Sequence, residues 1–277
     1  MKIVELEQGT NNWKTWRNQK ITATDVAVIL DMSPWGKTPL QLWKEKTGFE
    51  LPETANSAMS FGLSKEEEIR EHAAAEYGTK FMPVCIEHRT NSWAAASLDG
   101  YSEEKNMILE IKTCNFLDHI TAINKKIPKK YYPQIQWQIY CSGLDSAIYA
   151  SFHKDDIVYV EVEKDEKFIN DALIKCEEFY TYLTECIPPP KTTKDFEKVE
   201  EPEAFIKAQQ YKEADELEKE AKKRKEILKK ELLEFGDDGN FEIGDLKIYR
   251  INQKGRIDYD KLICDYQIDE HVLDKYR

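Results

Sequence analysis

The sequence lacks the features that define several large protein classes. No apolar run reaches the ~20 residues that a membrane-spanning helix needs, and no basic stretch followed by an apolar one opens the chain, so we expect neither a membrane partner nor export. The six cysteines are scattered without a C-x-x-C pair, which favours reduced thiols and argues against an iron–sulfur cluster. No histidine pair has metal-ligand spacing, and no G-x-x-x-x-G-K-S/T loop occurs, so we expect no zinc site and no nucleotide-driven motor.

The chain also lacks a net positive charge. Its formal charge is −12 at pH 7, whereas non-specific affinity for DNA comes largely from lysine and arginine side chains that neutralise phosphates. A net charge does not exclude a local basic surface, and two basic groups occur. They are the lysines of 125–130, next to Tyr131 and Tyr132, and the set Arg17, Lys20 and Lys37. The composition is therefore compatible with nucleic-acid binding.

Two helix starts can be identified near the N-terminus. Thr22 to Asp25 approximates a capping box, and a second helix begins at Thr38 with Pro39 in its first turn and ends near Gly48. The tryptophans of this region are expected in the core; they are Trp13, Trp16, Trp35 and Trp43.

The spacing of apolar residues predicts an alternation of helices and strands further along the chain. Helices are predicted over 57–78, 131–141 and 165–184. Strands are predicted over 80–87, 93–98, 107–112, 146–153 and 157–163. This order indicates an α/β core, in which a central mixed β-sheet is flanked by helices.

The composition changes after three consecutive prolines at 188–190. We therefore predict a core domain over 1–190 and a C-terminal extension over 191–277. The extension is predicted to contain a long charged helix over 203–235, a small hairpin made by 241–243 and 246–251, and two terminal helical pieces. The smaller apolar stripe of the long helix comprises Ala208, Tyr211, Ala214, Leu217, Ala221, Leu228, Leu232 and Phe235.

Two carboxylates and a lysine are predicted to meet at one rim of the sheet. Side chains two positions apart on a strand share a face, so Glu110 and Lys112 point the same way. Asp99 precedes Gly100 after an apolar run, where we expect one strand to turn towards the next. Carboxylates that hold Mg²⁺ can activate water for phosphodiester hydrolysis, and a lysine adds charge for the transition state. The alternative is a solvated surface pair of Glu110 and Lys112.

These residues resemble the D…(D/E)-x-K core of the restriction-endonuclease-like nucleases, the PD-(D/E)XK superfamily. The resemblance narrows to the lambda exonuclease and YqaJ-type phage recombinase family, whose motifs occur here in the same order over roughly the first two-thirds of the chain. The motifs are Trp13…Trp16-Arg17, Ile21-Thr22-Ala23-Thr24, Phe61-Gly62…Glu66, Ser97-x-Asp99-Gly100 and Gln134-Ile135-Gln136. A restriction-endonuclease-like core is the fold that this resemblance implies.

The resemblance also implies a metal site and its catalytic residues. One or two Mg²⁺ ions, or Mn²⁺ as a substitute, would be held by Glu66, Asp99, Glu110 and the backbone carbonyl of Ile111. Lys112, assisted by Gln136, would position and deprotonate the attacking water or stabilise the developing charge. For Glu66 the alternative is a boundary glutamate on a helix rich in that residue.

A pocket for the terminal 5′-phosphate is implied at Arg17, Thr24 and Ser97. A guanidinium binds a phosphate through two N–H groups, and hydroxyls near a helix start add donors. The alternative reading makes Thr22 and Thr24 simple helix caps and Arg17 a surface charge.

The function implied by the resemblance is a Mg²⁺-dependent 5′→3′ exonuclease. It would degrade one strand of linear double-stranded DNA and leave 3′ single-stranded tails for phage-type homologous recombination or single-strand annealing. One alternative is an endonuclease of the same superfamily, and another is a catalytically inert DNA-end-binding adaptor. Double-stranded DNA ends, a homotrimeric ring, a single-strand annealing protein as partner and a cytoplasmic location in a bacterial or phage-infected cell are further expectations from the family.

Overall fold

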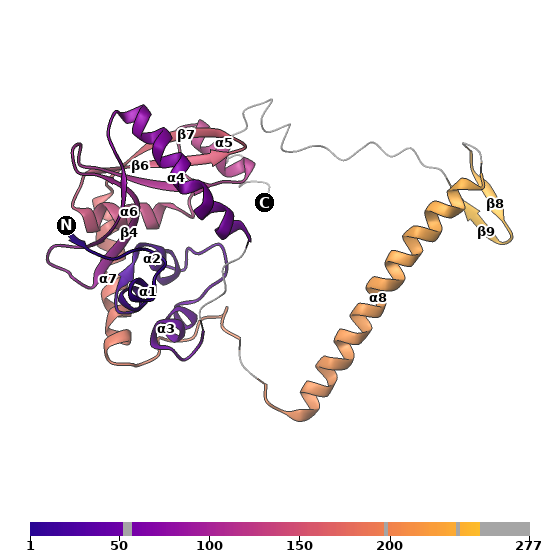
Figure 1. The fold of residues 1–277 in the computed structure, drawn as a ribbon. Helices are drawn as coiled ribbons and strands as arrows, with labels where there is room; N and C mark the ends of the chain where they lie inside the picture. The colour runs from indigo at the N-terminus through magenta and orange to yellow at the C-terminus, as the bar shows by residue number, and fades with distance from the viewer. Residues whose placement is uncertain (52–56, 197–198, 237–238, 250–277) are drawn as a thin grey trace. The chain divides into compact units, whose positions relative to one another are not determined.

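The computed structural model describes residues 1–51, 57–196, 199–236 and 239–249 (Figure 1). One compact unit includes Met1–Asp195, and a second unit begins at Phe196. Two contacts hold the end of the first unit to its own body. Lys194 Nζ lies 2.5 Å from Asp31 Oδ1, and Thr38 Oγ1 donates a hydrogen bond to Asp195 Oδ1 at 2.5 Å. The predicted terminal helical pieces lie outside the described residues.

Seven strands of the described chain form one mixed sheet in the first unit. The order is β1-β3-β4-β5-β6-β7, and β2 pairs with β4. The β2–β4 and β5–β6 pairs are parallel and the other pairs are antiparallel. The strands are β1 (Lys2–Val4), β2 (Ile21–Thr22), β3 (Met82–Glu87), β4 (Ala94–Ser102), β5 (Met107–Thr113), β6 (Ser146–His153) and β7 (Asp156–Glu163).

Helices cover both faces of this sheet, so the predicted α/β class is confirmed (Figure 1). On one face, Ile69 and Ala73 of α4 pack against Leu109 and Ile111 of β5. On the other face, α2, α3, α6 and α7 contribute to the larger apolar cluster. The helices of this unit are α1 (Asn11–Asn18), α2 (Ala23–Ile29), α3 (Pro39–Thr47), α4 (Ser57–Tyr77), α5 (Phe116–Ile123), α6 (Tyr132–Ser142) and α7 (Glu166–Thr184).

The predicted capping signals are confirmed. At the start of α2 the Thr22 N–H donates to Asp25 Oδ2 at 2.7 Å, and at the start of α3 the Gln41 N–H donates to Thr38 Oγ1 at 3.1 Å. Gly48 ends α3 with φ +80°, a left-handed conformation that side chains with a Cβ rarely adopt. The short strands β1 and β2 and helix α5 were not predicted, because two or three residues show no periodicity and α5 lies beside polar loops.

The tryptophan prediction is only partly correct. Trp43 is 5% exposed and belongs to the core, whereas Trp35 is 72% exposed in the loop before α3. Trp13 and Trp16 are half-buried, and their indole N–H groups donate to Ser97 Oγ at 2.8 Å and to a carboxylate oxygen of Glu87 at 3.0 Å. An indole has a polar edge as well as an apolar body, so these two residues join the core to polar groups at its margin.

The second unit contains the predicted long helix, α8 (Pro202–Glu234), and the predicted hairpin, β8 (Phe241–Ile243) and β9 (Leu246–Ile248). No residue of α8 is buried. Throughout the described ranges, every helix falls short of the length or the apolar character that a bilayer span requires.

Candidate active site

Asp99 lies at a bulge in strand β4. Strands β3 and β4 pair Val84 with Leu98 and, further along, Met82 with Tyr101. Strand β4 therefore has one more residue than β3 over this interval, and the extra residue falls beside Asp99. A bulge of this kind changes the direction of a side chain. The prediction placed Asp99 at a turn between strands; this was wrong, because the residue lies inside β4 and the bulge supplies the local change of direction.

The carboxylate of Asp99 bridges the gap between β4 and β5. The two strands pair as far as Gly100 and Leu109. A Cβ on Gly100 would lie 3.0 Å from Phe81 Cβ and 3.1 Å from Leu109 Cβ, so glycine keeps the strands close just before they separate. Beyond that point Asp99 Oδ2 accepts the N–H of Ile111 at 2.9 Å, while the Ile111 side chain packs in the core beneath α4.

Glu110 is 1% exposed, and both of its carboxylate oxygens are hydrogen-bonded. Lys112 Nζ and Gln134 Nε2 donate to Oε1, and Gln138 Nε2 donates to Oε2 at 2.5 Å. Gln134 and Gln138 come from α6, where residues four apart lie one above the other on the same face. The predicted pair of Glu110 and Lys112 is therefore present, but it is part of a buried network and not a solvated surface pair.

Gln136 lies outside this network. Its Nε2 donates to the Glu163 carbonyl at 2.8 Å, and its Oε1 accepts the Asp165 N–H at 2.8 Å. Two residues along a helix correspond to a rotation of about 200°, which turns Gln136 away from Gln134. Gln138, and not Gln136, is therefore the second glutamine that contacts Glu110. The family motif did not indicate Gln138. The four-residue spacing of two glutamines on a buried helix is the sequence signal that points to this pair.

Helix α4 brings Glu66 to the same end of the sheet. Gly62 lets the helix approach β5, since a Cβ there would lie 3.3 Å from Thr113 Oγ1. One turn further on is Glu66, and Arg70 follows after another turn. Arg70 Nη1 donates to the Asp99 carbonyl at 3.2 Å and lies 3.6 Å from Glu66 Oε2. Through Arg70, α4 is fixed to the bulge and contributes a third carboxylate.

The charges of this cluster change the pKa of Asp99, Glu66 and Lys112. Burial, and then the carboxylates of Glu110 and Glu66, raise the pKa of Asp99 well above its usual range. Burial also raises the pKa of Glu66, although Arg70 and Lys112 oppose this. For Lys112, burial disfavours the charge, but Glu110 and Asp99 outweigh it and raise its pKa. Lys112 is therefore an ammonium at neutral pH.

The donor set of this cluster suits a hard divalent cation. Mg²⁺ prefers oxygen ligands and is held by one or two carboxylates plus water. The repulsion among Glu66, Asp99 and Glu110 is what a bound cation relieves. As the described side chains stand, no three acidic, histidine or cysteine groups converge as a ready metal site. The oxygens of Glu110 are instead bound by nitrogen donors, so a metal would compete with Lys112 and the glutamines.

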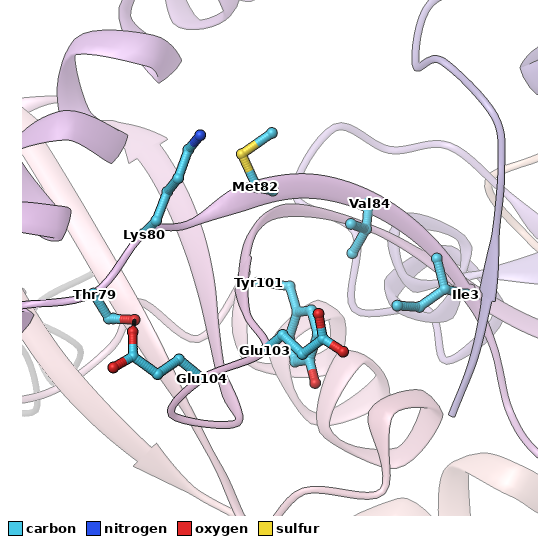
Figure 2. Close-up of a pocket in the computed structure, with 8 residues that line it drawn as sticks. All are labelled: Ile3, Thr79, Lys80, Met82, Val84, Tyr101, Glu103 and Glu104. Carbon is cyan, nitrogen blue, oxygen red and sulfur yellow. Dashed lines mark hydrogen bonds between the residues drawn. The ribbon is translucent and has the colours of Figure 1, made fainter.

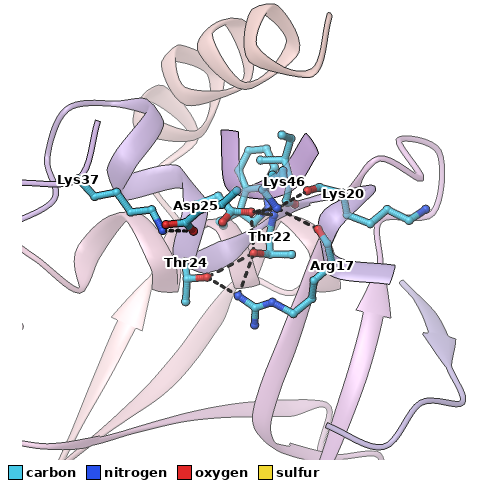
Figure 3. Close-up of polar contacts among 10 residues, drawn as sticks. Arg17, Lys20, Thr22, Thr24, Asp25, Lys37 and Lys46 are labelled. Atoms are coloured by element: carbon cyan, nitrogen blue, oxygen red, sulfur yellow. Dashed lines mark hydrogen bonds and ion pairs between the residues drawn. The ribbon is translucent and has the colours of Figure 1, made fainter. Parts of the chain in front are cut away.

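Arg17 and Thr24 meet at the start of α2 (Figure 3). Arg17 Nη2 donates to Thr24 Oγ1 at 2.7 Å and to Thr22 Oγ1 at 3.3 Å, and its Cζ lies 4.5 Å from the centre of the Trp13 ring. These direct partners are all neutral. Thr24 is exposed and Arg17 is half-buried. Burial lowers the pKa of Arg17, although the nearby Asp25 carboxylate opposes this.

Trp13 connects Arg17 to Ser97. Its ring lies under the guanidinium while its indole N–H donates to Ser97 Oγ at 2.8 Å. Ser97 and Asp99 are two residues apart on β4, so their Cα atoms are about 7 Å apart. The structure therefore brings the three residues of the implied phosphate pocket into one network and places that network next to the acidic cluster. The bridging role of Trp13 was missed, because its spacing indicated a core residue.

A buried ion pair fixes the position of Arg17 (Figure 3). Lys46 Nζ lies 2.8 Å from Asp25 Oδ2, and the two side chains are 5% and 8% exposed. The same ammonium donates to the carbonyls of Arg17 and Lys20 at 2.9 Å each. Asp25 also accepts the Thr22 N–H and hydroxyl at 2.7 Å. Lys46, from α3, thus joins the end of α1 to the start of α2, and no local sequence signal indicated it.

A cavity of about 510 Å³ has none of these residues in its wall. It is lined from β1, β3 and β4 and from the residues that follow β4, among them Ile3, Tyr101 and Glu103 (Figure 2). Two polar side chains in its wall are hydrogen-bonded to each other, since Thr79 Oγ1 donates to Glu104 Oε2 at 3.2 Å. The cavity contains none of the predicted site residues, so the candidate active site is the polar cluster where β4 and β5 separate.

Residues 12–145 match the family model of the YqaJ-like viral recombinase domain. This segment is thus similar to the YqaJ-like viral recombinase domain. It contains every predicted site residue from Arg17 to Gln136, together with Lys46 and Gln138.

Two curated proteins are similar to more than half of this chain. The uncharacterized protein YqaJ of Bacillus subtilis (strain 168) is 27% identical over 177 residues, which cover 62% of this chain and 55% of that protein. The uncharacterized protein R354 of Acanthamoeba polyphaga mimivirus is 26% identical over 191 residues, covering 62% of this chain and 33% of that protein. The chain thus spans about half the length of the first relative and a third of the second.

Two solved structures share the fold of nearly two thirds of this chain. LHK-Exo in complex with dAMP superposes with a TM-score of 0.56 at 25% identity, over 64% of this chain and 94% of that chain. The alkaline exonuclease LHK-Exo from Laribacter hongkongensis superposes with a TM-score of 0.54 at 24% identity, over the same shares. These likenesses confirm the predicted fold class.

Proposed function

We propose that the protein is a Mg²⁺-dependent exonuclease that degrades one strand of linear double-stranded DNA in the 5′→3′ direction. The product would carry 3′ single-stranded tails for phage-type recombination by single-strand annealing. The observation that carries this proposal is the adjacency of two clusters on β4, one anionic at Asp99 and one cationic at Arg17 with Ser97. The likeness to LHK-Exo, an alkaline exonuclease whose complex contains dAMP, supports it.

The anionic cluster is proposed as the catalytic part. Glu66, Asp99, Glu110 and the carbonyl of Ile111 would hold one or two Mg²⁺ ions, with Mn²⁺ as a substitute; the bound metal activates water and stabilises charge on the phosphate. Lys112 would supply a fixed positive charge where negative charge develops in the transition state. Gln134 and Gln138 would keep the Glu110 carboxylate in one orientation.

The cationic cluster is proposed to bind the terminal 5′-phosphate. Arg17 offers a guanidinium held by neutral partners, and Thr24 and Ser97 add hydroxyl groups. Ser97 and Asp99 lie two residues apart on β4, so the proposed phosphate pocket and the proposed metal site are neighbours. A terminal phosphate exists at a DNA end and not inside a continuous strand, so this pocket favours an exonuclease over an endonuclease of the same superfamily.

The assembly and partners are proposed from the family resemblance. A ring-shaped homotrimer would enclose the duplex, with the lysines of 125–130 near its path, and a single-strand annealing protein would receive the exposed strand. The site of action would be the cytoplasm, where bacterial and phage DNA lies.

Digestion of one linear duplex, labelled at either the 5′ or the 3′ end of one strand, tests the proposed function. With Mg²⁺ or Mn²⁺ the 5′ label should be released first as a mononucleotide, and the remaining duplex should acquire 3′ tails. EDTA should stop the reaction, and a covalently closed circle should stay intact. Cleavage of the circle would instead establish an endonuclease, and end binding without hydrolysis would establish an adaptor.

A further inference from the structure

The apolar stripe of α8 has no covering element among the described residues of its own unit. None of the 33 residues of the helix is buried, and Tyr211, Leu217 and Leu228 are 74%, 67% and 48% exposed. A helix of this length extends about 50 Å. The stripe recurs at every third or fourth position from Ala208 to Ala221 and again from Leu228 to Phe235. Such spacing is that of a seam by which one helix packs against another.

The parts of α8 before and after Ala221, its first and second halves here, differ in charge. The apolar stripe contains Ala208, Tyr211, Ala214 and Leu217 before Ala221, and Leu228, Leu232 and Phe235 after it. Acidic residues dominate the first half; they include Glu213, Asp215, Glu216, Glu218 and Glu220. Basic residues dominate the second half; they include Lys222, Lys223, Arg224, Lys225, Lys229 and Lys230.

We infer that α8 pairs antiparallel with the α8 of a second copy of this chain. In that orientation the mainly acidic half of each helix lies against the mainly basic half of the other. Ala214 and Leu228 are equally distant from Ala221, so a two-fold axis near Ala221 places them opposite each other. A parallel pair would instead set acidic against acidic and alanine against alanine.

Helix α8 has features that stabilise a helix exposed to water. Ion pairs between residues four apart, Lys219 with Asp215 and Lys222 with Glu218, both at 2.6 Å, stabilise a helix in water. Pairing through α8 joins chains two by two, so it gives a dimer when the first units do not associate and a hexamer when they form trimers. This inference does not depend on the nuclease activity.

The mass of the full chain by light scattering, over a range of concentrations, tests the pairing. Two triple variants reverse the charge of one half each: Glu213→Lys, Glu216→Lys and Glu220→Lys in the first, and Lys222→Glu, Lys225→Glu and Lys229→Glu in the second. Each variant alone should associate at least tenfold more weakly, because both of its halves then carry the same sign. An equimolar mixture of the two should recover the wild-type mass.

A third variant serves as the matched control. Lys154→Glu, Lys167→Glu and Lys175→Glu change the net charge as much as the second variant does, but at exposed positions of the first unit. Its mass should equal that of the wild type.

Disulfide trapping tests the orientation, in a Cys186→Ser background that removes an exposed thiol. Chains with Ala214→Cys should cross-link to chains with Leu228→Cys, and neither should cross-link to itself. Self-linking of each variant would establish a parallel pair and overturn the inference. A wild-type mass that the α8 reversals leave unchanged would also overturn it. So would a loss of duplex DNA affinity in the second variant without a change of mass, because the basic half would then be a DNA-binding surface.

Discussion

Two polar clusters lie side by side on β4, and they differ in sign and in the way that they are held. In the cluster at Asp99, burial and the carboxylates of Glu110 and Glu66 raise the pKa of Asp99, and donors from β5 and α6 hold Glu110 in place. The cluster at Arg17 places a cation among neutral hydroxyls and an indole ring. The first gains most from a bound cation and the second from a bound anion. A DNA end with Mg²⁺ supplies both.

The largest effect is expected from neutralising the carboxylates of the anionic cluster. Asp99→Asn and Glu110→Gln should each lower the cleavage rate by about a thousandfold or more, because each removes charge that holds the metal. Asp99→Asn relieves like-charge repulsion and can still accept the Ile111 N–H, so its melting temperature should stay the same or rise. Glu110→Gln sets an N–H₂ group against a donor and removes the counter-charge of Lys112, so its melting temperature should fall. Nuclease rate and thermal unfolding, measured on the same preparations, check this.

A third variant of the cluster and a control variant accompany these two. Lys112→Ala should also abolish cleavage, but it leaves Glu110 buried without its cation and should lower the free energy of unfolding by about 3 kcal/mol. Lys175→Ala, on the exposed face of α7, should change neither quantity. A Glu110→Gln enzyme that retains a tenth of the wild-type rate would remove this cluster from the catalytic role.

An intermediate loss of cleavage rate is expected for Gln138→Ala but not for Gln136→Ala. Gln138→Ala leaves one oxygen of the buried Glu110 without a donor, so it should cost about 1–3 kcal/mol of stability and slow cleavage by about ten- to a hundredfold. Gln136→Ala removes hydrogen bonds to Glu163 and Asp165 and should cost similar stability, while the rate per folded molecule stays unchanged. Single-turnover rates corrected for the folded fraction distinguish the two. A slower Gln136→Ala enzyme would restore the role that the family motif implies.

The smallest effect on cleavage is expected at Lys46. Lys46→Ala leaves Asp25 buried and unpaired, so it should lower the free energy of unfolding by about 3–5 kcal/mol. The substitution also removes the hydrogen bond from Lys46 to the Arg17 carbonyl, while the Arg17 side chain keeps its bond to Thr24. The preference for 5′-phosphorylated ends should therefore fall by only a few-fold. The double variant Asp25→Asn with Lys46→Met should recover much of the stability without recovering that preference. Chemical denaturation and end-preference assays check both.

Acid should weaken the same ion pair. Burial alone would raise the pKa of Asp25, but Lys46 and Arg17 outweigh it, so the folded-state pKa lies below the usual value. A depressed carboxyl pKa contributes stability that is complete above the unfolded-state pKa, near 4, and is lost as the pH falls through the folded-state pKa. Unfolding free energies of wild type and Asp25→Asn should therefore converge below about pH 4. A difference that stays constant down to pH 2 would contradict this.

Local sequence patterns indicated much of the site because they act over short range. The alternation of a strand placed Glu110 beside Lys112, and capping chemistry placed the starts of α2 and α3. The bulge at Asp99 could not be predicted, because it depends on the register between β3 and β4. Lys46 acts through backbone carbonyls of another helix, and Gln138 acts across the interface between α6 and β5. Such tertiary contacts leave no local periodicity.

The dependence of digestion on the 5′-phosphate tests most directly whether the two clusters act as one site. A duplex that ends in a 5′-hydroxyl loses a charge-assisted contact with Arg17 worth about 1.5–3 kcal/mol, so wild-type enzyme should start on it roughly ten- to a hundredfold more slowly. Arg17→Ala should slow phosphorylated ends to a similar rate and treat both ends nearly alike, which completes a double-mutant cycle with the substrate. Equal wild-type rates on 5′-phosphate and 5′-hydroxyl duplexes would contradict the assignment of Arg17 and favour internal cleavage.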